Sequence, residues 1–227
     1  MAKYINSGIT SSGVTLNVES MYVSSGGTAS QTVVNENGQL HISNGGIASQ
    51  TTVNKDGELH ISGGGIAFDT TVNQYGWVEV LAGGTATRGD IKDGGWFEVF
   101  PDGTATQIHV SSGGVFYVSS GGTASDTVFA GGSGATVNNG GVFINTSIGM
   151  GGMLGILHGG TAKDVHVASN GTIYVSEGAK LTGSMTFEDG AFVAFFDGPT
   201  LDFDITGRKS SDPPLVNNLS LIKGTPQ

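Results

Sequence analysis

The chain repeats itself every nineteen residues. Residues 22–40 read YVSSGGTASQTVVNENGQL, and the next two segments, 41–59 and 60–78, read HISNGGIASQTTVNKDGEL and HISGGGIAFDTTVNQYGWV. Further units begin at positions 79, 98, 117, 136, 155 and 174, with no insertion between them. A fixed period of about 20 to 50 residues indicates a stacked repeat architecture, in which each unit packs on its neighbours.

Two places of the unit carry apolar side chains that a strand would send to one face. With residue 22 as place 1, places 19 and 2 lie two residues apart, so both point inward and the residue between them points outward. β-Branched residues, which suit half-buried strands, fill place 2 in nine successive units. Place 2 holds Val23, Ile42, Ile61, Val80, Val99, Val118, Val137, Ile156 and Val175, and place 19 holds Leu40, Leu59, Val78, Phe97, Phe116, Ala135, Leu154, Ile173 and Phe192.

A second short strand is expected over places 7 to 13, with Ala at place 8 of most units. The recurring Ala predicts a narrow interior, and Phe143, which replaces it once, predicts a locally wider coil. Place 6 is Gly in eight consecutive units, and places 16 and 17 often read Asn-Gly, Asp-Gly or Gly-Gly. Gly and Asn-Gly supply the positive φ of tight corners, so we interpret the forty glycines as corner residues rather than as disorder.

Together these features predict an all-β chain, a single-stranded right-handed parallel β-helix (solenoid) of about ten nineteen-residue coils. Paired strands lie roughly 4.8 Å apart, which predicts a rod on the order of 50 Å long. The right hand is expected because crossover connections within one sheet are overwhelmingly right-handed. We assign residues 1–192 to the solenoid and 193–227 to a C-terminal cap or the junction to a missing segment.

Two irregularities are expected inside the solenoid. Residues 3–21 form a degenerate first unit in which Tyr4 replaces the usual Val or Ile. Near Lys180 and Phe187 the spacing indicates a one-residue adjustment.

Composition narrows the functional classes. Nineteen acidic residues against nine basic ones give a net charge of −10, which argues against binding to nucleic acid. No apolar run of eighteen residues is present, so we expect no membrane insertion by this segment. The start, MAKYINSG, lacks the apolar centre of a secretory signal, so the protein is either cytosolic or an excised piece of a larger precursor. We expect the excised piece, because the segment 219–227 stops in mid-pattern just after an expected strand.

No cofactor or metal is expected. His41 and His60 recur at place 1 and stack, but two ligands without a third are usually a plain surface ladder. The chain has no cysteine, and the calcium-binding glycine repeat is absent because Gly131-Gly-Ser-Gly-Ala lacks its Asp.

The unit resembles a known family. The sequence GGTAS followed by TVVN and a closing Asn-Gly or Gly-Gly is similar to the passenger-domain repeats of AIDA-type autotransporter adhesins and related bacterial surface proteins. The resemblance covers residues 3–192, and the later segments VAFFDGPTLDFDITGR and LVNNLSLIKG resemble those that follow such repeats. It implies a secreted stalk on the bacterial cell surface that mediates adhesion or self-association, sometimes O-glycosylated with heptose. The implied partners are host-cell or bacterial surface glycans and proteins, or further copies of the chain as a homo-oligomer.

One surface patch is predicted from the outward columns at places 18, 1 and 3. Neighbouring coils there present two tryptophans beside two carboxylates, a combination that binds sugar rings or other proteins. The alternative is that the aromatic side chains only stabilise cross-strand pairs. The predicted binding patch consists of Trp77, Glu79, Trp96, Glu98, Phe100, Tyr117 and His60.

Two other functions stay open. Glu79 and Glu98 would lie near 5 Å apart, a separation found in retaining glycosidases, so a carbohydrate-active enzyme (polysaccharide lyase or glycosidase) is one alternative. Catalysis also needs a cleft, and no long loop interrupts the repeat to build one, so we expect no enzyme and no catalytic residues. The other alternative is a purely structural spacer.

The hydroxyl side chains form two columns, of which one is expected to be exposed, depending on how the corner turns. By the resemblance, the exposed set would accept heptose. The alternative is ordinary strand and turn positions. Place 9, our predicted O-glycosylation set, holds Ser30, Ser49, Thr87, Thr106 and Ser125, and place 11 holds Thr32, Thr51, Thr70 and Thr127.

Overall fold

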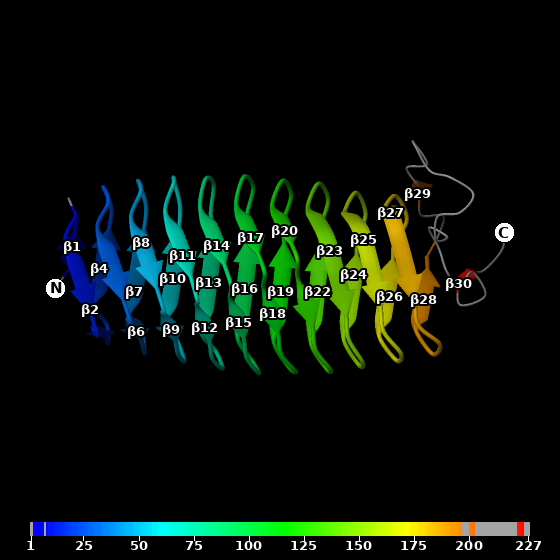
Figure 1. The fold of residues 1–227 in the computed structure, drawn as a ribbon, viewed down its shortest axis with the longest axis horizontal. Helices are drawn as coiled ribbons and strands as arrows, with labels where there is room; N and C mark the ends of the chain where they lie inside the picture. The colour runs from blue at the N-terminus through cyan, green and yellow to red at the C-terminus, as the bar shows by residue number, and fades with distance from the viewer. Residues whose placement is uncertain (1, 7, 197–199, 203–221, 225–227) are drawn as a thin grey trace.

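The structure, a computed structural model, describes residues 2–6, 8–196, 200–202 and 222–224, the last two ranges as backbone only. Within these residues every regular element is a β-strand, and the strands of successive coils pair in parallel. The coils lie side by side along the long axis, with the N-terminal coil at one end (Figure 1). The predicted β-solenoid of about ten coils is therefore confirmed, whereas its right hand stays a prediction.

The strands form two sheets. Sheet A takes one strand from each coil: β1 (Lys3–Ile5), β4 (Ser20–Val23), β7 (Gln39–Ile42), β10 (Glu58–Ile61), β13 (Trp77–Val80), β16 (Trp96–Val99), β19 (Val115–Val118), β22 (Gly134–Val137), β24 (Met153–Ile156), β26 (Thr172–Val175), β28 (Phe192–Phe195) and β30 (Ile222–Gly224).

Sheet B takes two short strands from each early coil and one longer strand from later coils. Its strands are β2 (Thr10–Ser12), β3 (Thr15–Leu16), β5 (Thr28–Ser30), β6 (Val33–Val34), β8 (Ile47–Ser49), β9 (Thr52–Val53), β11 (Ile66–Phe68), β12 (Thr71–Val72), β14 (Thr85–Thr87), β15 (Asp90–Ile91), β17 (Thr104–Thr106), β18 (His109–Val110), β20 (Thr123–Ser125), β21 (Val128–Phe129), β23 (Val142–Ile148), β25 (Thr161–Val167), β27 (Lys180–Phe187) and β29 (Thr200–Asp202).

The register places residues nineteen apart directly over one another. Ile42 pairs with Val23 on one side and with Ile61 on the other, and all three side chains are buried. The columns predicted from the repeat are therefore real columns, and the inward ones form one continuous core.

The first coil is one residue shorter than the others. Lys3 pairs with Met21, eighteen residues further on, so Tyr4 faces Tyr22 and Ile5 faces Val23. Tyr4 is exposed and Ile5 is buried. The prediction that Tyr4 replaces the inward Val or Ile is wrong, because Ile5 holds that place in a coil of eighteen.

A β-bulge near the other end confirms the expected one-residue adjustment. Lys163 pairs with Thr182 but Val165 pairs with Met185, so Asp164 opposes two residues. The Asp164 carboxylate accepts a hydrogen bond from the backbone N–H of Ser184 at 2.8 Å, which holds the extra residue in place.

The bulge changes the coil that follows it. A shift of one residue exchanges the two faces of a strand. Phe192, predicted to point inward, is 44% exposed, and Val193 takes the buried position. The prediction for Phe192 is therefore wrong, because counting by nineteen missed the inserted residue.

The glycines of place 6 have a different role from the predicted one. None of the eight, Gly27 to Gly160, has a positive φ, which recurs instead at places 5, 10 and 16, and at place 4 in the early coils. A Cβ at Gly46 would lie 2.2 Å from the carbonyl oxygen of Val23 in the preceding coil, and one at Gly84 would lie 2.2 Å from that of Ile61. Place 6 therefore needs Gly because the backbones of two coils meet there.

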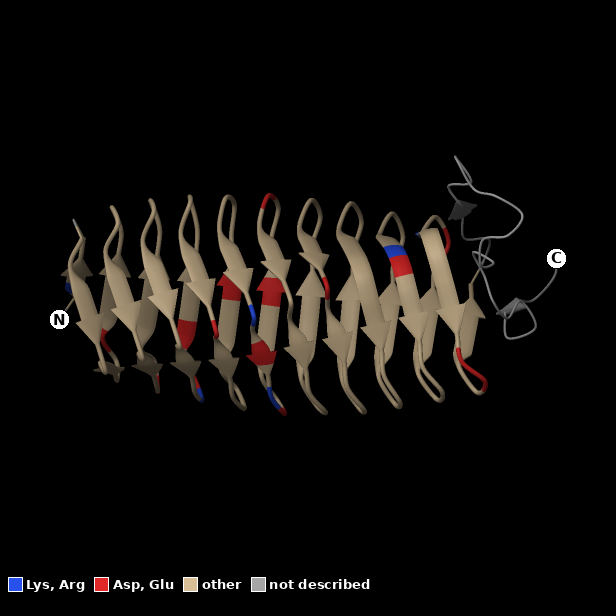
Figure 2. Cartoon of the chain, viewed as in Figure 1, with Lys and Arg blue, Asp and Glu red and all other residues tan. Residues whose placement is uncertain are grey.

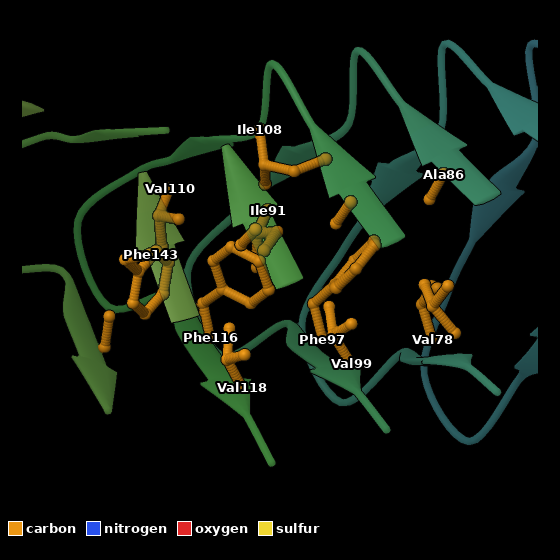
Figure 3. Packing of buried hydrophobic residues seen from close by; sticks show 14 of the residues in the cluster. Val78, Ala86, Ile91, Phe97, Val99, Ile108, Val110, Phe116, Val118 and Phe143 are labelled. Carbon is orange, nitrogen blue, oxygen red and sulfur yellow. The ribbon is translucent and has the colours of Figure 1, made fainter. Parts of the chain in front are cut away.

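The core contains an aromatic cluster at its centre (Figure 3). Phe116 packs edge-to-face against Phe97 and Phe143, with ring centroids 5.3 and 5.5 Å apart. Phe143 keeps the regular register with Ala124, and the column of Phe116 is occupied in the next coil by the small Ala135. One buried column therefore carries a larger side chain at Phe143, and the other carries a smaller one at Ala135. The predicted local widening stays a prediction.

At the C-terminal end, β29 and β30 continue the two sheets by parallel pairing with β27 and β28. The rest of the predicted cap, residues 197–199, 203–221 and 225–227, lies outside the described residues. The division of the chain at residue 192 stays a prediction. A search of the described residues for a helix that could cross a membrane finds none.

Candidate functional site

The predicted patch lies on sheet A, where consecutive coils present the outward columns of places 18 and 1. Trp77 pairs in register with Trp96, and Glu79 pairs with Glu98. Glu98 in turn pairs with Tyr117, and His60 pairs with Glu79. Phe100 follows β16 and is half-buried. The structure therefore brings the seven predicted residues onto four neighbouring coils, in a part of the solenoid where several strands carry acidic residues (Figure 2).

Three rings form what we call the aromatic ladder: Trp77, Trp96 and Tyr117. The rings of Trp77 and Trp96 stack with centroids 5.3 Å apart, and Trp96 stacks on Tyr117 at 4.7 Å. Trp77 is 40% exposed, whereas Trp96 and Tyr117 are half-buried. The indole Nε1 of Trp96 is buried without a hydrogen-bond partner among the described residues. The aromatic ladder is therefore a surface of stacked rings whose most solvent-exposed member is Trp77.

The carboxylates of the patch are engaged by separate neighbours. Oε2 of Glu79 lies 2.9 Å from Nδ1 of His60, and Nε2 of the same ring lies 3.1 Å from Oε2 of Glu58. Oε1 of Glu98 accepts a hydrogen bond from the Ser119 hydroxyl at 2.6 Å. The arrangement holds His60 between two carboxylates and gives Glu79 and Glu98 different partners, rather than a shared environment for an acid and base pair.

A second ring stack follows place 1 toward the N-terminus. The stack consists of the rings of Tyr4, Tyr22, His41 and His60. The centroids of successive rings lie 5.2, 4.6 and 4.8 Å apart. Burial lowers the pKa of His41, and the neighbouring His60 lowers it further, against the opposing effect of Glu58. Nε2 of His41 is buried without a partner among the described residues. Among those residues no group of three His, Cys, Asp or Glu side chains could hold a metal ion.

The hydroxyl columns separate into an outward and an inward set. Ser30, Thr87, Thr106 and Ser125 at place 9 are partly exposed, and Ser49 is 9% exposed. The place 11 threonines are buried. The corner lies between the two sets, at place 10, where every residue from Gln31 to Asp164 has a positive φ and breaks the strand alternation. Those corner residues are Gln31, Gln50, Asp69, Arg88, Gln107, Asp126, Asn145 and Asp164.

An ion pair lies in this corner column, beside Thr87. Nε of Arg88 donates to Oδ1 of Asp69 at 2.7 Å, and Nη2 donates to Oδ2 at 3.1 Å. These hydrogen bonds lower the pKa of Asp69. The pair is exposed to solvent and places two oppositely charged side chains on the surface of the corner.

Sequence reasoning missed Tyr75, which lines an open groove of about 230 Å³. The signal was present: place 16 is Asn, Asp or Gly in the other units between residues 22 and 173, and Tyr75 departs from it. The groove is bounded by Asn37, Asp56, Gly57, Glu58, Tyr75 and Trp77.

Comparison with known proteins places this geometry in context. No protein-family model matches the chain, and no curated protein shows significant sequence similarity to it. Among solved structures, the chain is similar to a TibC-catalysed, hyper-glycosylated fragment of TibA, residues 55–350. The two share 27% sequence identity with a TM-score of 0.66, over 90% of this chain and 92% of the fragment. Along nearly its whole length, this chain therefore shares its β-solenoid fold and about a quarter of its residues with a heavily glycosylated protein fragment.

Proposed function

We propose that this chain is part of a secreted bacterial cell-surface protein, an adhesin-like β-helix that acts as a rigid stalk and as a surface for adhesion or self-association. The similarity to the TibA fragment carries the proposal, because it extends over 90% of the chain. The resemblance of the GGTAS and TVVN repeats to those of AIDA-type adhesins supports it independently.

The stalk role follows from how the coils are joined. Each inner coil is hydrogen-bonded to both neighbours through two sheets, and the buried columns run through the length of the described solenoid. Stability in such a stack comes from the contacts between neighbouring coils. A rod of this kind holds surface groups at fixed spacings, so weak contacts along it act together on a multivalent partner.

The adhesive role is assigned to the aromatic ladder and the acidic groups beside it. The partners would be surface glycans, surface proteins or a second copy of the chain. Exposed aromatic side chains commonly supply the energetically dominant contacts of an interface. The enzyme alternative gains no support from the site, since Glu79 and Glu98 are engaged by His60 and Ser119.

The test is a double substitution, Trp96→Ala with Tyr117→Ala, which removes two rings of the ladder. We expect weaker self-association in sedimentation and weaker binding to a glycan array, with an unchanged β-sheet circular dichroism spectrum. Met153→Ala is the matched control, because Met153 is exposed at place 18 outside the patch.

Three outcomes decide between the alternatives. Binding that survives the double substitution in a folded protein would contradict the adhesive patch. The absence of any binding by the unsubstituted chain would favour a structural spacer. Release of reducing ends or unsaturated products from a polysaccharide panel would favour an enzyme.

We also propose that the partly exposed hydroxyl groups of place 9, those of Ser30, Thr87, Thr106 and Ser125, carry O-linked sugar, and we leave out the buried Ser49. The hyper-glycosylation of the TibA fragment supports this, together with the outward position of place 9 beside the corner. Intact mass of the natively produced protein would show sugar that is lost on Thr87→Ala and Thr106→Ala. Thr70→Val at the buried place 11 is the control, and a sugar-free native protein would contradict the proposal.

A further inference from the structure

The groove beside the ladder has a regular construction. Asp56 and Glu58 lie on one coil at places 16 and 18, and Tyr75 and Trp77 occupy the same places on the next coil. Glu58 pairs in register with Trp77, and the backbone N–H of Asp56 donates to the carbonyl oxygen of Tyr75 at 3.0 Å. Two carboxylates therefore lie beside two aromatic rings, one coil spacing apart.

Gly57 lies between the two carboxylate residues and contributes backbone alone. A Cβ on Gly57 would point inward, 2.4 Å from the carbonyl oxygen of Val34, so this place cannot carry a side chain without moving the coils apart. The groove is thus walled by side chains at places 16 and 18 and has main chain between them.

Both carboxylates retain an oxygen for a ligand. Glu58 uses Oε2 for Gln39 at 2.8 Å and for His60 at 3.1 Å, and its Oε1 has no hydrogen bond to a described residue. Asp56 forms an ion pair with Lys55, whose Nζ lies 3.8 Å from Oδ2. Both members of that pair are more than half exposed, so water screens the attraction and a competing cation can replace Lys55.

Tyr75 has no structural reason to be aromatic. Its φ of 58° lies in the left-handed region, which a bulky side chain seldom adopts. Its side chain is 61% exposed and makes no hydrogen bond or ring contact with a described residue. A strained backbone beneath a largely exposed aromatic side chain points to a function for that side chain.

From this arrangement we infer that the groove binds the side chain of a lysine presented by a partner protein. The four-carbon stem lies along Tyr75 and Trp77, and the ammonium group reaches Asp56 and Glu58. Cations are attracted to the faces of aromatic rings and to carboxylates alike, so all four side chains favour the same ligand. No basic side chain is among the six that line the groove.

Other ligand classes fit less well. An anion would be repelled by both carboxylates and by the net charge of −10. A neutral sugar can stack on Trp77 but gains nothing from the negative charge. A guanidinium is a flat fork suited to one bidentate carboxylate, whereas the two carboxylates here belong to separate residues, Asp56 and Glu58.

The experiment titrates a terminally blocked pentapeptide, Gly-Ser-Lys-Ser-Gly, into the isotope-labelled chain and follows the amides of Gly57 and Tyr75 and the indole N–H of Trp77. We expect saturable shifts at these three signals. The same peptide with an acetylated lysine, which keeps the stem and removes the charge, should cause none. Tyr75→Asn should weaken binding by roughly two- to fivefold, the contribution of one exposed ring.

Lys55→Gln provides a second readout, because it removes the competing cation and should strengthen binding. Equal binding of the acetylated peptide, binding of a neutral hexose in place of the lysine peptide, or an unchanged affinity in Tyr75→Asn would each overturn the inference. Tyr117→Ala separates this groove from the proposed adhesive ladder: it should leave the lysine peptide bound while it impairs self-association.

Discussion

The coils around residues 60–117 and those around residues 134–155 share continuous buried columns but carry different residue types on the outward face of sheet A. Inward, Phe116, Ala135 and Leu154 continue one buried column without a break in register. Outward, the column that holds Glu98 and Tyr117 goes on as Thr136 and Gly155. The fold therefore depends on the inward columns, and the outward columns are available for function.

The largest expected effect is the difference in stability between alanine substitutions at two adjacent residues of β19, one inward and one outward. Phe116→Ala removes a fully buried ring and should lower the free energy of unfolding by about 3 to 5 kcal/mol. Tyr117→Ala, next to it but outward, should cost about 1 kcal/mol or less. Urea denaturation measures both, and equal losses would contradict the separation of columns.

A smaller contrast is expected between two adjacent glycines. Gly84→Ala forces a methyl group against the carbonyl of Ile61 and should cost about 3 kcal/mol. Gly83→Ala has room for the methyl group and costs only the left-handed backbone, about 1 kcal/mol. Thermal denaturation compares them, and an equal or larger loss at Gly83 would contradict close approach of the backbones as the reason for Gly at place 6.

Tyr75→Asn is expected to raise stability, by up to about 1 kcal/mol, because Asn tolerates a positive φ better than an aromatic residue. The gain should accompany the loss of lysine binding described above. A clear loss of stability, measured by denaturation, would mean that the Tyr75 ring supports the fold after all.

The smallest effect is a pH dependence from His41. The pKa of His41 is lower in the folded chain than its ordinary value near 6.5, so the unfolded chain binds more protons. Stability is complete above about pH 6.5 and falls as the pH drops from there toward the lowered pKa. His41→Tyr keeps an aromatic ring in the stack and removes the titrating group. The melting temperature of this variant should therefore change less between pH 7 and pH 5 than that of the unsubstituted chain.

His158→Tyr is the control for this pH effect, because His158 lies exposed in a corner. An equally steep acid loss in the His41→Tyr variant would assign the pH dependence to other groups.

Much of the candidate site could be predicted by counting. The neighbours Trp77 and Trp96, and Glu79 and Glu98, follow from the period alone, since a column needs only a constant repeat length. The exceptions are where the length changes. A coil of eighteen moved Tyr4 outward, and the bulge at Asp164 moved Phe192 outward, because one residue is enough to exchange the two faces of a strand.

The sequence by itself determined the architecture, the inward columns and the order of residues along each outward column, because in a solenoid these are set by period and alternation. Tertiary structure decided what depends on backbone conformation and side-chain direction. It showed that place 10 turns in the left-handed region, which buries Thr70 and leaves Thr87 outward. It also showed that His60 lies between two carboxylates and that Tyr75 opens onto a groove, since both depend on contacts between coils that no single unit contains.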